Sequence, residues 1–392
     1  MQFTTTRRMF LASSFSSALL LAAASDDLVQ TIKTPNGGLQ PQAAVDSKVV
    51  LHVVYLYGDP AAADVGYVRK APGSRAFTPP IRVNDRPGSA IAIGTVRGVH
   101  LAIGKQGRVH VAWNGSSKAE PKGPGNASPM LYTRMNDAGS GFESQRNLMT
   151  TAAGLDGGGT VAADSLGNVY VTWPAQGQKD GKRLEGEAHR RVWLARSTDG
   201  GKTFAAEIAV SPAELGACAC CGMGALADSD GNLYLMYRTA RETIHRDMYL
   251  LMSRDRGKTF QAVDLSPWEI GGCPMSTVSL ASQNGRVLLS WETKKQVYFA
   301  PVDISTRKVG EPIGAPGEGP NRKHPSIATN KRGDILLAWT EGTGWKKGGA
   351  LAWQTFDRAG RPLPVKGTAD GAVPPWGFAA AVPSKSGFVI IG

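Results

Sequence analysis

The octet Ser-Arg-Asp-Arg-Gly-Lys-Thr-Phe at positions 253–260 has a close copy at 197–204, Ser-Thr-Asp-Gly-Gly-Lys-Thr-Phe. Both octets follow the pattern Ser-x-Asp-x-Gly-x-Thr-aromatic. The short Ser and Asp side chains can bond nearby backbone amides, the glycine allows a positive φ, and the aromatic ring can pack back between two sheets. Two such turns at equivalent positions predict a repeated all-β structure.

A longer repeat surrounds these octets. A polar turn ends in Gly, an alternating strand follows, and Trp or Tyr stands six residues after that Gly. Five copies are Gly107 with Trp113, Gly167 with Trp173, Gly231 with Tyr237, Gly285 with Trp291, and Gly333 with Trp339. A sixth copy begins at 40–45 and reaches Tyr55, fourteen residues after Pro41, the interval that also separates Pro325 from Trp339. Four strands in a period near fifty residues are typical of a β-propeller blade.

The two ends of the chain predict how the ring closes. Segments 378–382 and 388–391 have the pattern of the first two strands of another blade, and 28–33 can supply an outer strand to it. Sharing a blade between both termini removes exposed sheet edges. We therefore expect seven four-stranded blades, with six as the alternative if the terminal strands only complete a blade already counted.

The two octets resemble the Asp-box (BNR) repeats of the sialidase-like propeller superfamily, and the resemblance covers nearly all of the chain after its first residues. It implies that the octets are structural. True sialidases also carry a Phe/Tyr-Arg-Ile-Pro motif, whereas positions 68–72 read Val-Arg-Lys-Ala-Pro, and no Tyr-Glu nucleophile pair can be assigned. Sialic acid hydrolysis is therefore not expected, and glycoside hydrolase-like activity on another substrate stays open.

The first residues have the character of an export signal. Positions 6–11, Thr-Arg-Arg-Met-Phe-Leu, resemble a twin-arginine leader, the apolar run at 18–24 is too short to span a membrane, and 22–24 offers a small-residue cleavage site. An ordinary secretory leader is the alternative. We expect a leader at 1–24, a single propeller domain at 25–392, no later transmembrane segment, and a periplasmic or secreted monomer.

Composition narrows the choice of partner. The chain has 392 residues and a formal net charge of +12, which favours an anionic small molecule or glycan, although many basic exported proteins have no such ligand. No basic motif interleaved with aromatic residues is present, so nucleic acid is not expected.

Blade topology predicts which face carries function. The octets and the Gly turns lie on one face, and the longer connections lie on the other, where binding residues tend to occur. Loops 174–191, 239–247 and 266–275 are expected to enclose a basic pocket there. The cations on these and neighbouring loops are Lys179, Lys182, Arg183, Arg190, Arg191, Arg241, Arg246, Arg322 and Lys323.

All four cysteines lie on this face, at Cys218, Cys220, Cys221 and Cys273. Cys220, Cys221 and Cys273 stand at nearly equal offsets from their repeat glycines, so we expect their thiols to meet. Export favours a disulfide from Cys273 to the first group. The same geometry, with Met275 and His324 nearby, would make a soft site for copper(I) or zinc. Inert packing is a third alternative.

Two loops supply candidates for carbohydrate chemistry. Glycoside cleavage commonly needs two carboxyl groups at a fixed separation, and the candidate acids are Glu242, Asp247 and Glu269. The candidate substrate-binding residues are Arg238, Arg241, Arg246 and Trp268. The cluster as a whole resembles a group of exported bacterial sialidase-like proteins with a Cys-x-Cys-Cys and a later Cys-Pro. The alternatives are an ion-paired loop, a metal-binding or redox protein that uses the cysteines, and a non-catalytic ligand-binding propeller.

Overall fold

A computed structural model describes Met1 and residues 28–94, 97–180 and 182–392. Apart from Met1, the predicted leader lies outside these residues and stays a prediction. In the part of the chain that is described, no helix is long and apolar enough to cross a membrane.

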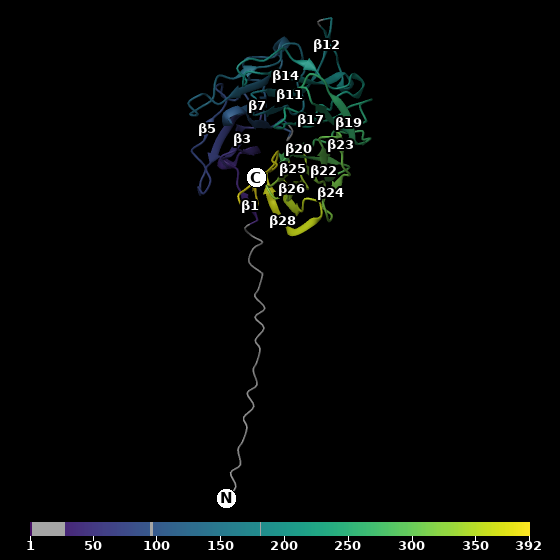
Figure 1. Ribbon diagram of the computed structural model, residues 1–392. Helices are drawn as coiled ribbons and strands as arrows, with labels where there is room; N and C mark the ends of the chain where they lie inside the picture. The colour runs from purple at the N-terminus through teal and green to yellow at the C-terminus, as the bar shows by residue number, and fades with distance from the viewer. Residues whose placement is uncertain (2–27, 95–96, 181) are drawn as a thin grey trace.

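The strands form seven sheets arranged as the blades of a propeller (Figure 1). The first three blades are β2 to β5 (Leu39–Val45, Leu51–Asp59, Ala62–Lys70, Ile81–Arg82), β6 to β9 (Val99–Ile103, Val109–Asn114, Met130–Arg134, Arg146–Asn147), and β10, β11, β14 and β15 (Thr160–Ala163, Val169–Gln176, Arg190–Ser197, Ile208–Ala209). A small hairpin, β12 (Gln178–Lys179) and β13 (Lys182–Arg183), extends from the third.

The next three blades are β16 to β19 (Gly224–Ala227, Leu233–Arg238, Met248–Ser253, Gln261–Ser266), β20 to β24 (Ser279–Gln283, Arg286–Thr293, Gln296–Asp303, Lys308–Val309, Ile313–Gly314), and β25 to β28 (Lys323–Thr329, Ile335–Glu341, Gly349–Phe356, Pro362–Val373). Short 3-10 turns η1 to η5 occupy Pro35–Gly37, Lys105–Gly107, Pro124–Asn126, Glu187–His189 and Ala213–Leu215.

The seventh blade is shared by the two ends of the chain. It contains β29 (Ala380–Pro383), β30 (Phe388–Ile391) and β1 (Val29–Ile32), and β1 pairs in parallel with β30 so that Val29 lies opposite Phe388. Figure 1 shows the C-terminus beside β1. The predicted seven-bladed ring with a shared last blade is thus confirmed, although this blade has three strands among the described residues rather than four.

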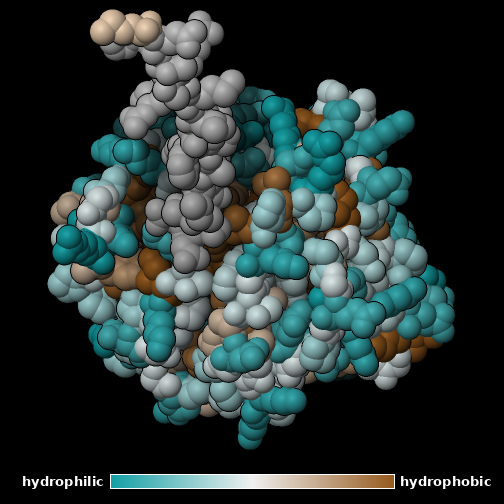
Figure 2. Space-filling model, turned by 90° about the horizontal axis from the view of Figure 1, so that it is seen from below, coloured by the Kyte–Doolittle hydropathy of each residue, from teal (hydrophilic) through white to brown (hydrophobic). Residues whose placement is uncertain are grey.

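The repeat aromatics form the packing between blades. Tyr55, Trp113, Trp173, Tyr237 and Trp291 are at most 1% exposed. The apolar clusters join neighbouring sheets, as where Met236 of β17 packs with Leu289 of β21. A fully buried aromatic side chain removes a large apolar area from water. The residue that recurs six positions after each repeat glycine is therefore a core residue. The surface view in Figure 2 shows mainly hydrophilic side chains, with apolar residues in separate small groups.

The two octets adopt the predicted turns. The hydroxyl of Ser253 donates to Asp255 Oδ1 at 2.7 Å and accepts the amide of Gly257 at 2.8 Å, and Thr259 donates to Asp255 Oδ2 at 2.6 Å. Gly257 has a φ of +76°. The copy at 197–204 makes the equivalent bonds. These turns are therefore held by their own polar side chains, in agreement with a structural role.

Candidate functional site

Three of the four cysteines form a compact sulfur triangle in the loop that precedes β16. Cys218 Sγ lies 3.4 Å from Cys220 Sγ and 3.4 Å from Cys221 Sγ, and all three sulfurs lie within 4.8 Å of one another. A circle through such a triangle has a radius of at most about 2.4 Å, close to the ~2.3 Å of a zinc–thiolate bond. One metal ion can therefore contact all three sulfurs without moving the loop.

Backbone hydrogen bonds to three blades hold this loop. Cys218 N–H donates to Arg238 O at 2.8 Å, Gly222 N–H donates to Ser276 O at 2.9 Å, and Gly158 N–H donates to Cys221 O at 3.0 Å. Gly157 allows the close approach, because it has a φ of +77° and a Cβ there would lie 2.8 Å from Cys221 O. The sulfur positions are thus fixed by the junction of the third, fourth and fifth blades.

The three thiols are coupled by their contacts. Burial alone would raise the pKa of Cys221, but hydrogen bonds from Cys218 and Cys220 and the charge of Arg238 outweigh burial and lower that pKa. The pKa of Cys220 is raised by its hydrogen bonds to the other two sulfurs and by burial. The site therefore favours one thiolate, at Cys221, that accepts from its neighbours.

Arg238 lies beneath this loop on β17 and is 2% exposed. Its Nη1 donates to Arg246 O at 2.7 Å, and its Nη2 donates to Glu292 O and lies 3.5 Å from Glu292 Oε2. The guanidinium also lies over the ring of Trp268, 5.0 Å from its centroid. Glu292 is fully buried, and burial raises its pKa while the Arg238 charge lowers it. Arg238 is therefore a structural cation within reach of the thiolate rather than an open substrate contact.

Two further buried arginines, Arg190 and Arg246, lie near the sulfurs. Arg246 is 4% exposed and its Nη2 donates to Glu187 Oε2, while Glu187 Oε1 accepts the amide of Ala219 at 2.9 Å. Arg190 is 9% exposed and donates from Nη1 to Gly154 O at 2.7 Å. Glu187 thus joins loop 174–191 to the cysteine loop and to loop 239–247, while the expected basic pocket between loops 174–191, 239–247 and 266–275 stays a prediction.

Cys273 and His324 do not join the group of three sulfurs. All four cysteines are free, and Cys273 is exposed and does not belong to the triangle. Met275 is half-buried with a φ of +51°. His324 is 3% exposed, and its Nδ1 forms a hydrogen bond of 3.3 Å with Thr277 Oγ1. Burial and the charge of Lys323 lower the pKa of His324 to about 3. The triangle therefore supplies three sulfur ligands on its own.

The predicted catalytic loops do come together. Residues His245 and Glu269 form a β-bridge, and Arg246 N–H donates to Trp268 O at 2.7 Å. Asp247 is 4% exposed and accepts the Trp268 amide at 2.8 Å. The structure thus places loops 239–247 and 266–270 side by side.

Two of the three candidate acids in these loops, Glu242 and Asp247, make ion pairs. Glu242 is exposed and lies 3.6 Å from Arg241 and 3.5 Å from His245, while Arg241 lies 3.7 Å from Asp247. Glu269 is exposed. An ion-paired loop, the alternative to a catalytic pair, agrees with these contacts.

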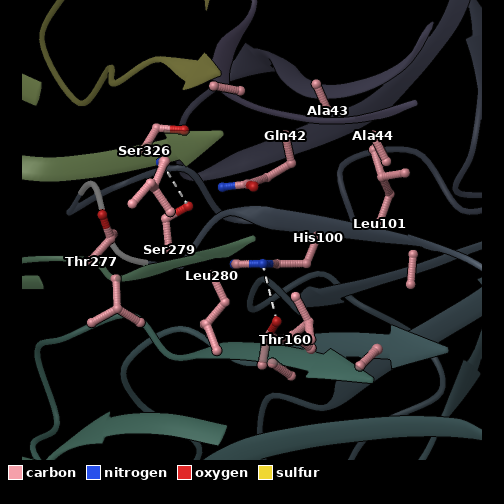
Figure 3. A pocket seen from close by; sticks show the side chains of 18 of the residues that line it. Gln42, Ala43, Ala44, His100, Leu101, Thr160, Thr277, Ser279, Leu280 and Ser326 are labelled. Carbon is pink, nitrogen blue, oxygen red and sulfur yellow. Dashed lines mark hydrogen bonds between the residues drawn. The ribbon is translucent and has the colours of Figure 1, made fainter. Parts of the chain in front are cut away.

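The central channel of the ring is lined by residues that the sequence analysis did not single out. A cavity of about 250 Å³ is lined by the innermost strands of all seven blades, with His100, Thr160, Thr277, Ser279 and Ser326 among its polar residues (Figure 3). His100 Nδ1 lies 3.2 Å from Thr160 Oγ1, and burial lowers the pKa of His100 to about 4. Small side chains such as Ala43 and Ala44 leave this space open. The alanines in the innermost strands were the sequence signal that could have indicated this cavity.

Comparisons with known proteins identify the fold. No protein-family model and no curated protein matches the chain. A Penicillium chrysogenum alpha-L-arabinanase, solved with arabinobiose, has a TM-score of 0.51 and 13% identity, with 83% of this chain and 95% of that chain covered. A leech intramolecular trans-sialidase has a TM-score of 0.48 and 8% identity, with 91% and 86% covered. An Aleuria aurantia lectin has a TM-score of 0.47 and 11% identity, with 87% and 97% covered. At identities of 8–13% the likeness to these proteins concerns the fold alone.

Proposed function

We propose that this protein binds a soft metal ion, copper(I) above all, at Cys218, Cys220 and Cys221. The observation that supports the proposal most is the sulfur triangle, whose three sulfurs lie within 4.8 Å of one another. Thiolates select copper(I) and zinc over hard cations. Export of the chain through a twin-arginine leader, and a periplasmic monomer as the working form, are part of the same proposal.

Copper(I) suits this ligand set better than zinc. Structural zinc sites are almost always four-coordinate, and catalytic ones combine three protein ligands with a water. Among the described residues, no His, Asp, Glu or further Cys joins the three cysteines as a fourth member of the group. Three sulfur ligands satisfy a trigonal copper(I) ion without help. Zinc would need an external ligand, so we expect it to bind more weakly.

The buried cations have a supporting role in this proposal. Arg238 favours the thiolate form of Cys221, and the pKa of Arg246 is raised by nearby charges that include Cys218 and Cys220 although burial lowers it. Metal binding requires deprotonated sulfur. Fixed positive charge beside the thiols therefore lowers the pH at which copper can be bound.

The test is a copper(I) titration of the mature protein under anaerobic, reducing conditions, with bicinchoninate as the competing chelator. We expect one copper per chain, and at least a hundredfold weaker binding for Cys218→Ser and for Cys221→Ser. Cys273→Ser is the matched control, because Cys273 is exposed and outside the triangle, and it should bind copper normally. Equal copper binding by wild type and Cys221→Ser would contradict the proposal. A parallel titration with zinc checks the preference.

We also propose that loops 239–247 and 266–270 bind an anionic glycan. It is supported by the bridge between His245 and Glu269, which sets the exposed acids Glu242 and Glu269 in adjoining loops beside Arg241. A screen of glycans and aryl glycosides tests it, with Glu242→Gln and Glu269→Gln as the informative variants. Binding that persists in both variants, without turnover, would leave a ligand-binding role for these loops.

A further inference from the structure

The three arginines around the sulfur triangle carry polar hydrogens that nothing in the structure accepts. Arg246 Nε and Nη1, Arg190 Nε and Arg238 Nε are buried, and none of them has a hydrogen-bond partner among the described residues. Buried donors without partners are rare in native proteins and indicate a missing water or ion. An unsatisfied buried donor destabilises the folded state, and more so when the group is charged.

These donors differ in how far their charge is already balanced. Arg246 pairs with Glu187, and Arg238 pairs with the buried Glu292. Arg190 donates to a backbone carbonyl, at Gly154, and no carboxylate of the described chain lies within ion-pair distance of it. Burial lowers the pKa of Arg190, and the charges of Asp156 and Glu187, which form no ion pair with it, offset this only in part; a charge that is not fully paired is costly to bury. The Arg190 end of the site therefore has the greater need of negative charge.

Glu187 ties these groups to the cysteines. One carboxylate oxygen accepts from Arg246 and the other accepts the amide of Ala219, which stands between Cys218 and Cys220. Arg190 directly follows η4, which contains Glu187. Burial is the largest influence on the pKa of Arg190 and of Arg246, and the charge of Cys218 acts on both, so both guanidiniums lie near that sulfur.

We propose that Arg190 and Arg246 form a subsite for a small anion beside the sulfur triangle. The ligand is a halide or small oxyanion that accepts the free N–H groups of both guanidiniums. The inference extends the proposed metal function, because it provides an anionic co-ligand at the same site, but its evidence is separate. The open donors exist whether or not a metal binds to the cysteines.

Bromide is the probe, because it is a simple anion with an anomalous X-ray signal. Metal-free protein is titrated with sodium bromide by calorimetry at low ionic strength, and crystals are soaked in the same salt. We expect saturable binding and an anomalous peak within hydrogen-bond distance of Arg246 Nη1 or Arg190 Nε. Arg246→Met and Arg190→Met should each weaken binding at least tenfold. Arg361→Met is the control, since Arg361 is 81% exposed in its side chain and pairs with Asp357 on the surface.

Two variants guard against a folding artefact. Arg246→Met leaves Glu187 without its partner, whereas Arg190→Met keeps the Arg246–Glu187 pair intact. No heat from the wild type, or equal heat from wild type and Arg190→Met, would show that only water fills the site and would overturn the proposal. Copper(I) titration of the same samples separates the two ideas. If the protein binds bromide but not copper(I), only the metal proposal is refuted. If it binds copper(I) but not bromide, only the anion proposal is refuted.

Discussion

Replacement of Arg238 by Met should be among the most destabilising single changes on the loop face. The guanidinium is 2% exposed, donates to the carbonyls of Arg246 and Glu292, and lies 3.5 Å from the carboxylate of Glu292. Methionine keeps much of the apolar stem and its packing on Trp268. The change therefore removes the charge and the donors while it leaves the volume nearly constant.

The magnitude follows from what remains behind. Glu292 is fully buried, and removal of one partner from a buried ion pair typically costs about 3–5 kcal/mol. Glu292→Gln in the same chain removes the orphaned charge, so the double variant should recover about half of the loss or more. The surface pair Arg361–Asp357 is the comparison, because exposed pairs contribute about 0–1 kcal/mol. Arg361→Met should barely change the stability.

The pH dependence gives a sharper test. Burial already raises the pKa of Glu292, and Arg238 is the largest cause that lowers it. Without Arg238 that pKa rises further. Between the ordinary Glu pKa and the raised one, the folded state binds a proton that the unfolded state has lost, so the free energy of unfolding falls as pH increases. The stability lost in Arg238→Met should be smallest near pH 4.5, the reference pKa of Glu292, and should grow toward neutral pH.

Urea unfolding followed by tryptophan fluorescence measures these differences in the metal-free protein. We expect the free energies of unfolding of Arg238→Met and the double variant to converge at acidic pH and to diverge at pH 7. A double variant that is no more stable than Arg238→Met at pH 7 would refute it, because the cost would then come from lost hydrogen bonds alone.

Three further changes have defined outcomes. Asp255→Asn should cost about 1 kcal/mol at pH 7. Burial would raise the pKa of Asp255, but hydrogen bonds led by those from Thr259 outweigh burial and lower it, so the difference in urea midpoint should shrink as pH falls from the ordinary Asp pKa toward the lowered one; a constant difference would contradict this. Gly257→Ala should cost about 1–2 kcal/mol, since a side chain at a φ of +76° is strained, and an unchanged melting temperature would count against it. Cys273→Ser should remove the fastest-reacting thiol in an iodoacetamide time course, because Cys273 is the exposed cysteine; survival of the fast phase would show that a triangle sulfur reacts instead.

The fold could be predicted because its determinants repeat along the chain. Each Gly-to-aromatic interval fixes a turn and a core residue together, and Trp113, Trp173 and Trp291 all proved to be buried. The shared last blade also followed from pattern, with β29 and β30 at the predicted segments. The short outer strands, such as Ile81–Arg82 and Ile208–Ala209, left little pattern to read, because two residues show no alternation.

The site could be predicted in part. Cys218, Cys220 and Cys221 are close in sequence, so their proximity needed only a turn. The offset of Cys273 from its repeat glycine did not determine its surroundings, since a shift of one residue in an extended segment reverses the direction of a side chain. The segment 271–278 is outside the regular strands, and Met275 has a positive φ. The similar number of residues between each cysteine and its repeat glycine was therefore not enough to predict the position of Cys273.

The open guanidinium donors could not be predicted from the chain at all. An arginine in a basic loop is ordinarily solvated, and only the packing of three loops makes Arg190, Arg238 and Arg246 buried. The same packing explains why a rigid propeller can hold such a site. The cysteine loop is irregular, yet its backbone is bonded to Gly158, Arg238 and Ser276, which belong to successive blades. The blades cannot shift without breaking the ring, so they hold the three sulfurs and the arginines together. These groups therefore stay adjacent and buried, although water would solvate them better apart.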